Sequence, residues 1–301
     1  MEFTVPKIYT RMLESPHILI AGTTGSGKSV ALNSLLYSAM LEAVESGKEA
    51  AFTYVDLKMI ELVDWRDLPN CDKYVDRPED VAKALKGAVD AMYARYKVMQ
   101  SKHIKETEEG HVYIVVDELA DLVKDKQVLE HLVTLGRLGR AAHYHLILCT
   151  QDPSRTTLSA ALMQNMTCRV ALRTKDPIES RQIVGRAGAE RLPKHGKGLM
   201  DMDGQVEAIT VPMVPQEDIQ MLIQTFGPVA YTPKSETKTV SVNGWTFRPP
   251  MTTEEKLREQ IAALKKEVEE LKSAPKNARE ERLEYQLAEA RATIERLMDA
   301  Q

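Results

Sequence analysis

The sequence predicts an α/β protein with a mostly parallel central sheet flanked by helices, followed by an α-helical, coiled-coil-like tail. Three observations lead to this prediction. Short apolar runs alternate with helical patterns along most of the chain. A glycine-rich loop separates the first apolar run from the first long helical pattern. Near the C-terminus, apolar residues recur at heptad spacing.

Length and composition are those of a globular protein that can bury a large core. The chain has 301 residues, 43% hydrophobic and 28% charged, with a formal net charge of −4. This charge gives no support for nucleic-acid binding, so a polyanion site would have to be a local basic surface. The three cysteines have no paired spacing, which predicts reduced thiols. With no signal-like N-terminus and no membrane-length apolar run, we expect a cytoplasmic protein without direct membrane insertion.

Apolar runs predict the strands, at residues 17–21, 51–55, 112–116, 145–149 and 168–172. They are apolar on both faces, which is typical of a sheet covered by helices on both sides. Helical patterns lie between them, at residues 29–44, 78–99 and 126–135. Two further runs, 198–202 and 206–211, flank Asp203-Gly204 and predict a hairpin. The spacing after Asp201 and Asp203 does not continue as a calcium loop requires, which favours a tight turn.

The glycine-rich loop, residues 22–29, is Gly-Thr-Thr-Gly-Ser-Gly-Lys-Ser and matches the phosphate-binding P-loop pattern G-x-x-x-x-G-K-[ST]. Glycines let backbone N–H groups surround phosphates, and the following helix adds the positive end of its dipole. We therefore expect ATP here, with Lys28 at the β- and γ-phosphates and Ser29 holding Mg²⁺. The expected nucleotide-binding residues are Gly22, Thr23, Thr24, Gly25, Ser26, Gly27, Lys28, Ser29 and Val30.

The apolar run at residues 112–116 ends in Asp117-Glu118. Hydrolysis of ATP needs such carboxylates: Asp117 is expected to bind Mg²⁺ through water, and Glu118 to polarise the attacking water as general base. The alternative is that these acidic residues only cap the next helix. Their position after a P-loop favours the catalytic interpretation.

Gln151 follows the apolar run at residues 145–149 and Thr150. A polar side chain at the carboxyl end of a strand beside the P-loop strand is placed to sense the γ-phosphate or its water. A glutamine that only caps the loop is the alternative interpretation.

Together, these residues resemble the motor domain of the FtsK/SpoIIIE family of double-stranded DNA translocases, within the wider HerA–FtsK group. The resemblance extends over about two hundred residues, from Ser15 to Val214. Many ATPases share the P-loop, but the ordered series of matching segments is specific to this family. The matching segments are residues 16–29, 55–62, 116–122, 139–142, 145–146, 150–154, 179–183 and 187–190.

The resemblance implies a RecA-like P-loop NTPase that assembles as a homo-oligomer, a hexameric ring with duplex DNA in its pore. By the same resemblance Gln151 is the family's sensor and Arg140 its arginine finger, which reaches the γ-phosphate of a neighbouring subunit. The residue type alone does not distinguish Arg140 from a surface arginine, and Arg137 is nearby. Arg181 lies in another matching segment and is a second candidate for the subunit boundary.

The chain departs from the family pattern in three ways. Asp152 stands where the family usually has arginine. From this sequence we expect no membrane-spanning region, little of the domain that precedes the motor, and no winged-helix segment. These differences favour a compact motor of a plasmid, phage or other mobile element over a septum-anchored chromosome pump.

A local basic surface is expected if DNA is the track, because phosphate contacts supply most non-specific affinity. Between residues 169 and 197, basic side chains outnumber acidic ones. Subunit contacts and a solvated face are the alternatives, and sequence-specific recognition has no support. The basic residues are Arg169, Arg173, Lys175, Arg181, Arg186, Arg191, Lys194 and Lys197.

The composition changes near Gly227 and divides the chain into an ATPase domain over residues 1–227, a β-hairpin strap over 228–250 and a helical tail over 251–301. Two heptad-spaced series in the tail are out of phase, which favours two helices over one rod. Each is short, so a helix packed on its own domain is an alternative. The series are Leu257, Ile261, Leu264, Val268 and Leu271, then Leu283, Leu287, Ala290, Ile294 and Leu297.

The leading hypothesis is a ring-shaped motor that moves double-stranded DNA with energy from ATP hydrolysis. One alternative is the ATPase of a secretion or conjugation system that moves a protein or nucleoprotein. Another is a nucleotide-regulated adaptor that recruits a protein partner through its coiled-coil tail. The presence of Glu118 and Gln151 argues against an adaptor.

Overall fold

The computed structural model describes residues 6–46, 49–68, 70–226, 240–242 and 245–247. These residues belong to a compact unit that spans residues 1–250. The predicted helical tail and both of its heptad series lie outside the described residues.

An eight-stranded sheet forms the centre, in the order β3-β2-β4-β5-β1-β6-β7-β8. The strands from β3 to β6 in this order run parallel, and β7 and β8 are antiparallel. The sheet is therefore mostly parallel, as the sequence predicts. Its strands are β1 (His17–Ala21), β2 (Ala50–Val55), β3 (Cys71–Val75), β4 (His111–Val116), β5 (Tyr144–Thr150), β6 (Cys168–Ala171), β7 (Lys197–Met202) and β8 (Gln205–Thr210).

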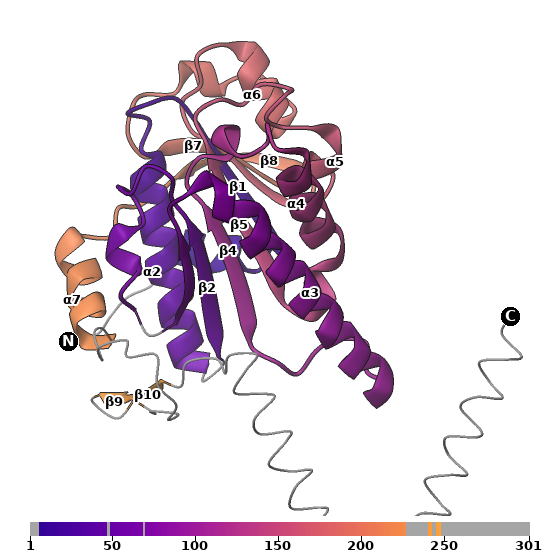
Figure 1. The fold of residues 1–301 in the computed structure, drawn as a ribbon. Coiled ribbons are helices and arrows are strands. Elements are labelled where there is room, and N and C mark those ends of the chain that lie inside the picture. The colour runs from indigo at the N-terminus through magenta and orange to yellow at the C-terminus, as the bar shows by residue number, and fades with distance from the viewer. Residues whose placement is uncertain (1–5, 47–48, 69, 227–239, 243–244, 248–301) are drawn as a thin grey trace, which may run out of the picture. The chain divides into compact units, whose positions relative to one another are not determined.

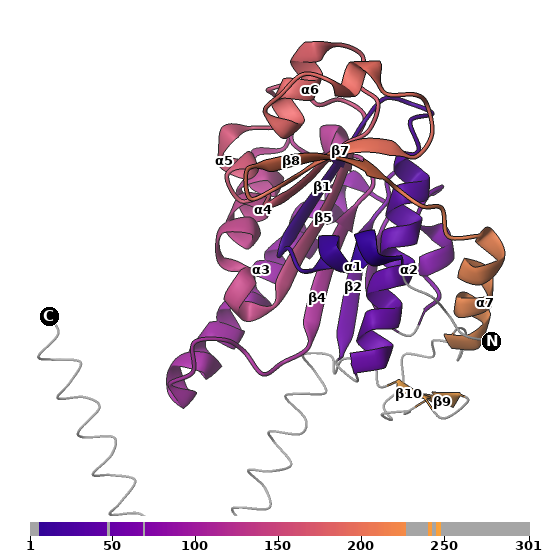
Figure 2. The ribbon, with the colours of Figure 1, turned by 180° about the vertical axis from the view of Figure 1, so that it is seen from behind.

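Helices cover both faces of the sheet (Figures 1 and 2). On one face lie α1 (Lys7–Leu13), α2 (Lys28–Ser46) and α7 (Gln216–Phe226). On the other lie α3 (Pro78–Lys102), α4 (Lys126–Leu138) and α5 (Ala160–Met163). The short helix α6 (Pro177–Val184) follows the carboxyl end of β6. Among the described residues, no helix is long and apolar enough to cross a membrane.

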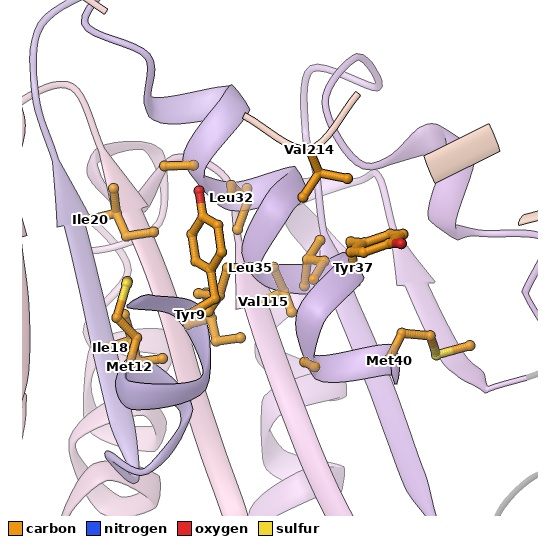
Figure 3. Close-up of a cluster of buried hydrophobic side chains, with 14 of the residues drawn as sticks. Tyr9, Met12, Ile18, Ile20, Leu32, Leu35, Tyr37, Met40, Val115 and Val214 are labelled. Atoms are coloured by element: carbon orange, nitrogen blue, oxygen red, sulfur yellow. The ribbon is translucent and has the colours of Figure 1, made fainter. Parts of the chain in front are cut away.

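Two apolar clusters, one on each face, anchor the sheet. In the first, Tyr9 and Met12 of α1 pack with Ile18 of β1 and Leu32 of α2 (Figure 3). Each fully buried side chain of this size stabilises the fold by about 1.5–3 kcal/mol. The cluster fixes β1 and α2, the two elements that flank the P-loop.

Strand β3 is the element of the sheet that the sequence analysis missed. It is an edge strand whose Asp72 and Lys73 are exposed, and its pairing with β2 shifts register between Phe52 and Thr53. Charged residues on an edge strand discourage pairing with other chains. They also interrupt the apolar pattern by which the other strands were found.

Both predicted hairpins are confirmed. Between β7 and β8, Asp203 and Gly204 have positive φ values of 52° and 86°. The Gly204 N–H donates to the Asp201 carboxylate over 2.9 Å, which makes a tight turn. Strands β9 (Val240–Val242) and β10 (Trp245–Phe247) pair antiparallel, and the Asn243-Gly244 step between them lies outside the described residues.

Histidines gather where β1, β4 and β5 begin, at the amino edge of the sheet. His111 and His145 share a hydrogen bond of 2.8 Å between Nδ1 and Nε2, and the rings of His111 and His143 stack 4.5 Å apart. Burial lowers the pKa of His145 to about 3, with the neighbouring histidines adding to the shift. Burial likewise lowers the pKa of His17 to about 4, and His17 is only 2% exposed. The fold therefore favours the neutral form of His17 and His145.

We predict that acid destabilises the protein partly through His17. In the unfolded chain, His17 binds a proton once the pH falls below its ordinary pKa of 6.5. In the folded chain, it does so only near pH 4. Stability is therefore full above about pH 6.5 and falls as the pH decreases toward 4. Between pH 7 and 5 we expect His17 to account for a loss of about 2 kcal/mol, measured by urea denaturation.

The matched variant is His17→Asn, whose amide oxygen can replace Nδ1 as acceptor for the Leu146 N–H. It should lose less stability between pH 7 and 5 than the unsubstituted protein. His131→Gln, on α4, should lose as much as the unsubstituted protein. Equal losses in both variants would contradict the prediction.

Candidate nucleotide site

The P-loop joins β1 to α2, so the structure has the strand–loop–helix context that the sequence predicts. Gly25 and Gly27 have positive φ values of 76° and 100°, a backbone region that other residues rarely adopt. The Thr23 N–H donates to the Arg173 carbonyl over 2.9 Å and so ties the loop to the segment after β6. The loop therefore lies at the carboxyl edge of the sheet, bonded to the segment after β6.

Lys28 and Asp117 form a buried ion pair at this edge. The Lys28 Nζ donates to the Asp117 Oδ1 over 3.1 Å and to its carbonyl over 3.0 Å. Burial works to lower the pKa of Lys28, but neighbouring Cys149, Asp117 and Glu118 more than offset it, so the pKa is above its ordinary value. The lysine is therefore a cation positioned for phosphates.

Glu118 is held by hydrogen bonds from the end of β5. Its Oε1 accepts from the Thr150 hydroxyl over 2.7 Å, and its carboxylate accepts from the Gln151 N–H over 3.1–3.2 Å. Glu118 also caps the 3₁₀ helix η2 (Leu119–Asp121) by accepting from the Ala120 N–H. Glu118 thus both caps η2 and lies in the candidate site. Thr150 is a further site residue, which was not selected from the sequence.

Gln151 reaches the P-loop. Its Oε1 accepts a hydrogen bond from the Thr24 hydroxyl over 2.7 Å, across 127 residues of sequence. The side chain therefore lies beside the phosphate-binding loop. The structure brings Gln151, Glu118, Asp117 and Lys28 to one edge of the sheet.

Two acidic residues after β2 also belong to this edge, and the sequence analysis gave neither a role. Asp56 follows β2 directly and is fully buried. Glu61 accepts a hydrogen bond from the Ser29 hydroxyl over 2.7 Å. The signal was available for Asp56, because it follows its strand as Asp117 follows β4.

The oxygen ligands at this edge fit Mg²⁺, a hard cation. Ser29 and Asp117 would hold the ion, which would neutralise charge on the phosphates. Within the described part of the chain, no three His, Cys, Asp or Glu side chains are arranged to hold a metal.

Arg140 lies at the opposite edge of the sheet from the P-loop of its own chain. It is exposed, in the 3₁₀ helix η3 (Arg140–Ala142) just before β5 begins. The length of β5 separates the two positions by about 20 Å, too far for one side chain. The structure therefore does not bring Arg140 into its own nucleotide site. Exposed Arg181 lies in α6, and exposed Arg137 in α4.

One member of the predicted basic surface is used inside the fold. The Arg169 guanidinium donates to the Met166 and Met163 carbonyls over 2.8 and 2.7 Å and lies 3.8 Å from Asp201. The Arg169 side chain therefore stabilises the fold and is not part of the exposed basic surface. Helix α6 lies at the top of Figure 1. The exposed basic residues of the segment lie in or near α6 and as far as the start of β7: Lys175, Arg181, Arg186, Arg191, Lys194 and Lys197.

Asp152 organises the loop after Gln151. Its Oδ1 accepts from the Ser154 N–H over 3.1 Å, and its Oδ2 accepts from the Ser154 and Thr157 hydroxyls over 3.2 Å. An arginine has no acceptor atoms and could not make these bonds. The aspartate at this position therefore stabilises its loop through hydrogen bonds within the loop itself.

The fold and the site define the class of protein. A P-loop lysine is paired here with the carboxylate that follows β4, a parallel strand separated from the P-loop strand by β5, and a second carboxylate comes next. This is the arrangement of a P-loop ATPase. The particular family follows from comparison. The family model described as "FtsK/SpoIIIE family" matches residues 2–197, and the chain belongs to this family.

Relatives named "DNA translocase FtsK" are similar over most of this chain. The protein of Caldanaerobacter subterraneus is 32% identical over 227 residues, which is 70% of this chain and 32% of the relative. That of Lactococcus lactis strain MG1363 is 35% identical over 209 residues, 62% of this chain and 27% of the relative. The chain thus spans about a third or less of the relatives it matches.

Solved structures agree on the fold. The pCW3 conjugation coupling protein TcpA, with ATPγS, superposes with a TM-score of 0.59 at 24% identity, over 69% of this chain and 65% of TcpA. EssC ATPases 2 and 3 from Geobacillus thermodenitrificans superpose with a TM-score of 0.60 at 20% identity, over 71% of this chain and 45% of EssC.

We predict that Gly27→Ala weakens ATP binding at least about 10-fold. An added Cβ would lie 3.2 Å from the Gly196 N in a backbone conformation disfavoured for alanine, which distorts the loop. The measurement is equilibrium binding of a fluorescent ATP analogue. Gly185→Ala is the matched control, because Gly185 also has positive φ, 74°, but ends α6 in open space. Equal affinity in the two variants would contradict the prediction.

Proposed function

We propose that this protein is an ATP-driven motor that moves double-stranded DNA without sequence specificity. The observation that carries the proposal is that Lys28, Asp117, Glu118 and Gln151 meet at one sheet edge in a chain of the FtsK/SpoIIIE family. The proposal includes a cytoplasmic hexameric ring, ATP with Mg²⁺ as cofactors, and plasmid, phage or other mobile-element DNA as cargo.

In the proposed reaction, the P-loop amides and Lys28 bind the phosphates, and Ser29 and Asp117 hold Mg²⁺. Glu118 orients and deprotonates the attacking water. Its bonds to Thr150 and Gln151 fix the carboxylate, and Gln151 links it to Thr24 of the P-loop. Through Gln151, the state of the γ-phosphate is coupled to the loop after β5.

The proposed ring completes each site with Arg140 from a neighbour. The exposure of Arg140 and its distance from the P-loop of its own chain support action between subunits. A guanidinium at the γ-phosphate stabilises the charge that develops in the transition state. Hydrolysis would then depend on assembly.

The proposed DNA contacts are the exposed basic residues around α6. These residues come after β6 in the sequence. Arg173, just after the end of β6, accepts a hydrogen bond at its carbonyl from the Thr23 N–H of the P-loop. A movement of the P-loop would therefore be transmitted to this segment. Repetition around a ring would concentrate the positive charge although each chain is slightly acidic.

A second candidate is the ATPase of a conjugation or secretion system that moves a protein or nucleoprotein. The likeness in fold to a conjugation coupling protein supports this candidate. DNA dependence of the ATPase rate separates the two candidates, because a protein substrate would leave turnover insensitive to DNA alone.

We predict that long duplex DNA stimulates ATP turnover, and that turnover per chain rises with protein concentration as rings assemble. Glu118→Gln should reduce kcat by about 10²- to 10⁴-fold while ATP still binds, because the general base is lost. Lys28→Ala should lose ATP binding itself. Steady-state phosphate release and nucleotide binding measure these effects.

Asp125→Asn is the matched control for Glu118→Gln. Asp125 also caps a helix, α4, and lies outside the site. It should retain turnover. An ATPase rate that depends on neither DNA nor protein concentration would refute the ring motor. A rate that rises with protein concentration but is not stimulated by DNA would favour the second candidate.

We predict that Arg140→Ala reduces turnover about 10³-fold without weakening ATP binding, because the finger acts on the transition state. Mixing this variant with Lys28→Ala should restore part of the turnover. In mixed rings, a Lys28→Ala chain can supply its intact Arg140 to the intact P-loop of a neighbouring Arg140→Ala chain. Arg137→Ala, the exposed neighbour on α4, should behave like the unsubstituted protein. No gain on mixing would show that Arg140 does not act between subunits.

A further inference from the structure

The hydroxyl of Ser29 donates its hydrogen to Glu61, with 2.7 Å between Oγ and Oε1. Both side chains are half-buried, and Glu61 lies in the loop after β2. A hydroxyl oxygen offers its lone pairs to a metal best when its hydrogen points to another acceptor. Glu61 supplies such an acceptor at the serine expected to hold Mg²⁺.

A buried aspartate shapes the loop that carries Glu61. The Oδ2 of Asp56 accepts from the Ile60 and Leu62 N–H groups, each over 3.0 Å, and from the Tyr74 hydroxyl over 3.2 Å. These bonds hold the residues on both sides of Glu61. The position of its carboxylate is therefore set by the end of β2, a fixed part of the sheet.

A second contact clamps the same loop onto α2. The Trp65 indole N–H donates to the Asn33 Oδ1 over 2.6 Å, and the Asn33 amide donates to the Ser29 carbonyl over 3.0 Å. Trp65 is 1% exposed, so the clamp is part of the core. The first turn of α2 and the Glu61 loop thus form one hydrogen-bonded unit.

In this structure the Ser29 hydroxyl donates to Glu61, and Asp117 accepts from Lys28 through its Oδ1 and its carbonyl. Burial raises the pKa of Cys149 to about 12; the Lys28 charge opposes this shift, and the charges of Asp117, Glu118 and Glu61 add to it. The negative charge of Glu61 is therefore felt at the end of β5, beside Lys28 and Asp117.

We propose that Glu61 is a positioning residue of the Mg²⁺–nucleotide site. It takes the hydrogen of the Ser29 hydroxyl, so that the Ser29 oxygen is directed to the cation, and its charge strengthens the attraction for the cation. Glu61 acts through Ser29 and does not touch the nucleotide. This inference rests on the proposed function, which assigns Mg²⁺ and ATP to the site.

The test is equilibrium binding of a fluorescent ATP analogue, first in EDTA and then with increasing Mg²⁺. In the nearly isosteric Glu61→Gln, we expect about a 10-fold higher Mg²⁺ concentration at half-effect, and unchanged affinity in EDTA. Adding Glu61→Gln to Ser29→Ala should change the Mg²⁺ midpoint by less than about twofold, because the effect passes through Ser29.

Asp121→Asn is the matched control. Asp121 lies 4.0 Å from Lys58 of the same loop and is exposed, so its variant loses a nearby charge and keeps the Ser29 contact. It should retain the Mg²⁺ dependence of the unsubstituted protein. An unchanged midpoint in Glu61→Gln, or equal weakening with and without Mg²⁺, would overturn the role of Glu61 alone. Failure of the unsubstituted protein to bind the analogue at all would instead refute the proposed function.

Discussion

The parallel register of β2, β4, β5 and β1 is the constraint on which the site depends. Val55 pairs with Val116, Val116 with Leu148, and Ala21 with Thr150, so these four strands end at nearly the same level. The residues that follow them are Asp56, Asp117, Gln151 and the P-loop. Side chains separated by up to about 130 residues therefore meet without any local sequence signal that joins them.

Much of the fold could be predicted because buried parallel strands are continuous apolar runs. Strand β1 has the predicted bounds, and each of the other predicted strands of the sheet differs by one residue at one or both ends. Strand β3 was missed because its exposed charges hide it. The P-loop was predictable because strand, glycines, lysine and serine are contiguous in the sequence.

The contacts around the P-loop were less predictable. The bonds from Thr150 to Glu118, from Thr24 to Gln151 and from Ser29 to Glu61 each join different strand ends. No periodicity encodes such contacts, because they arise from sheet order and register. Arg169 was grouped with the surface arginines for the same reason, since its carbonyl partners lie in the turn before β6. The residue type predicts a positive charge at Arg169, but whether that charge faces solvent or bonds within the protein depends on the fold.

The thiols have a practical consequence. Cys71, Cys149 and Cys168 are all free, and burial raises the pKa of each to about 12. Alkylating reagents attack thiolates, so at neutral pH the folded chain should offer them almost no native target. A single cysteine introduced on the surface would then carry a fluorophore with little background. Conformational changes at the sheet edge could be followed without first removing the native cysteines.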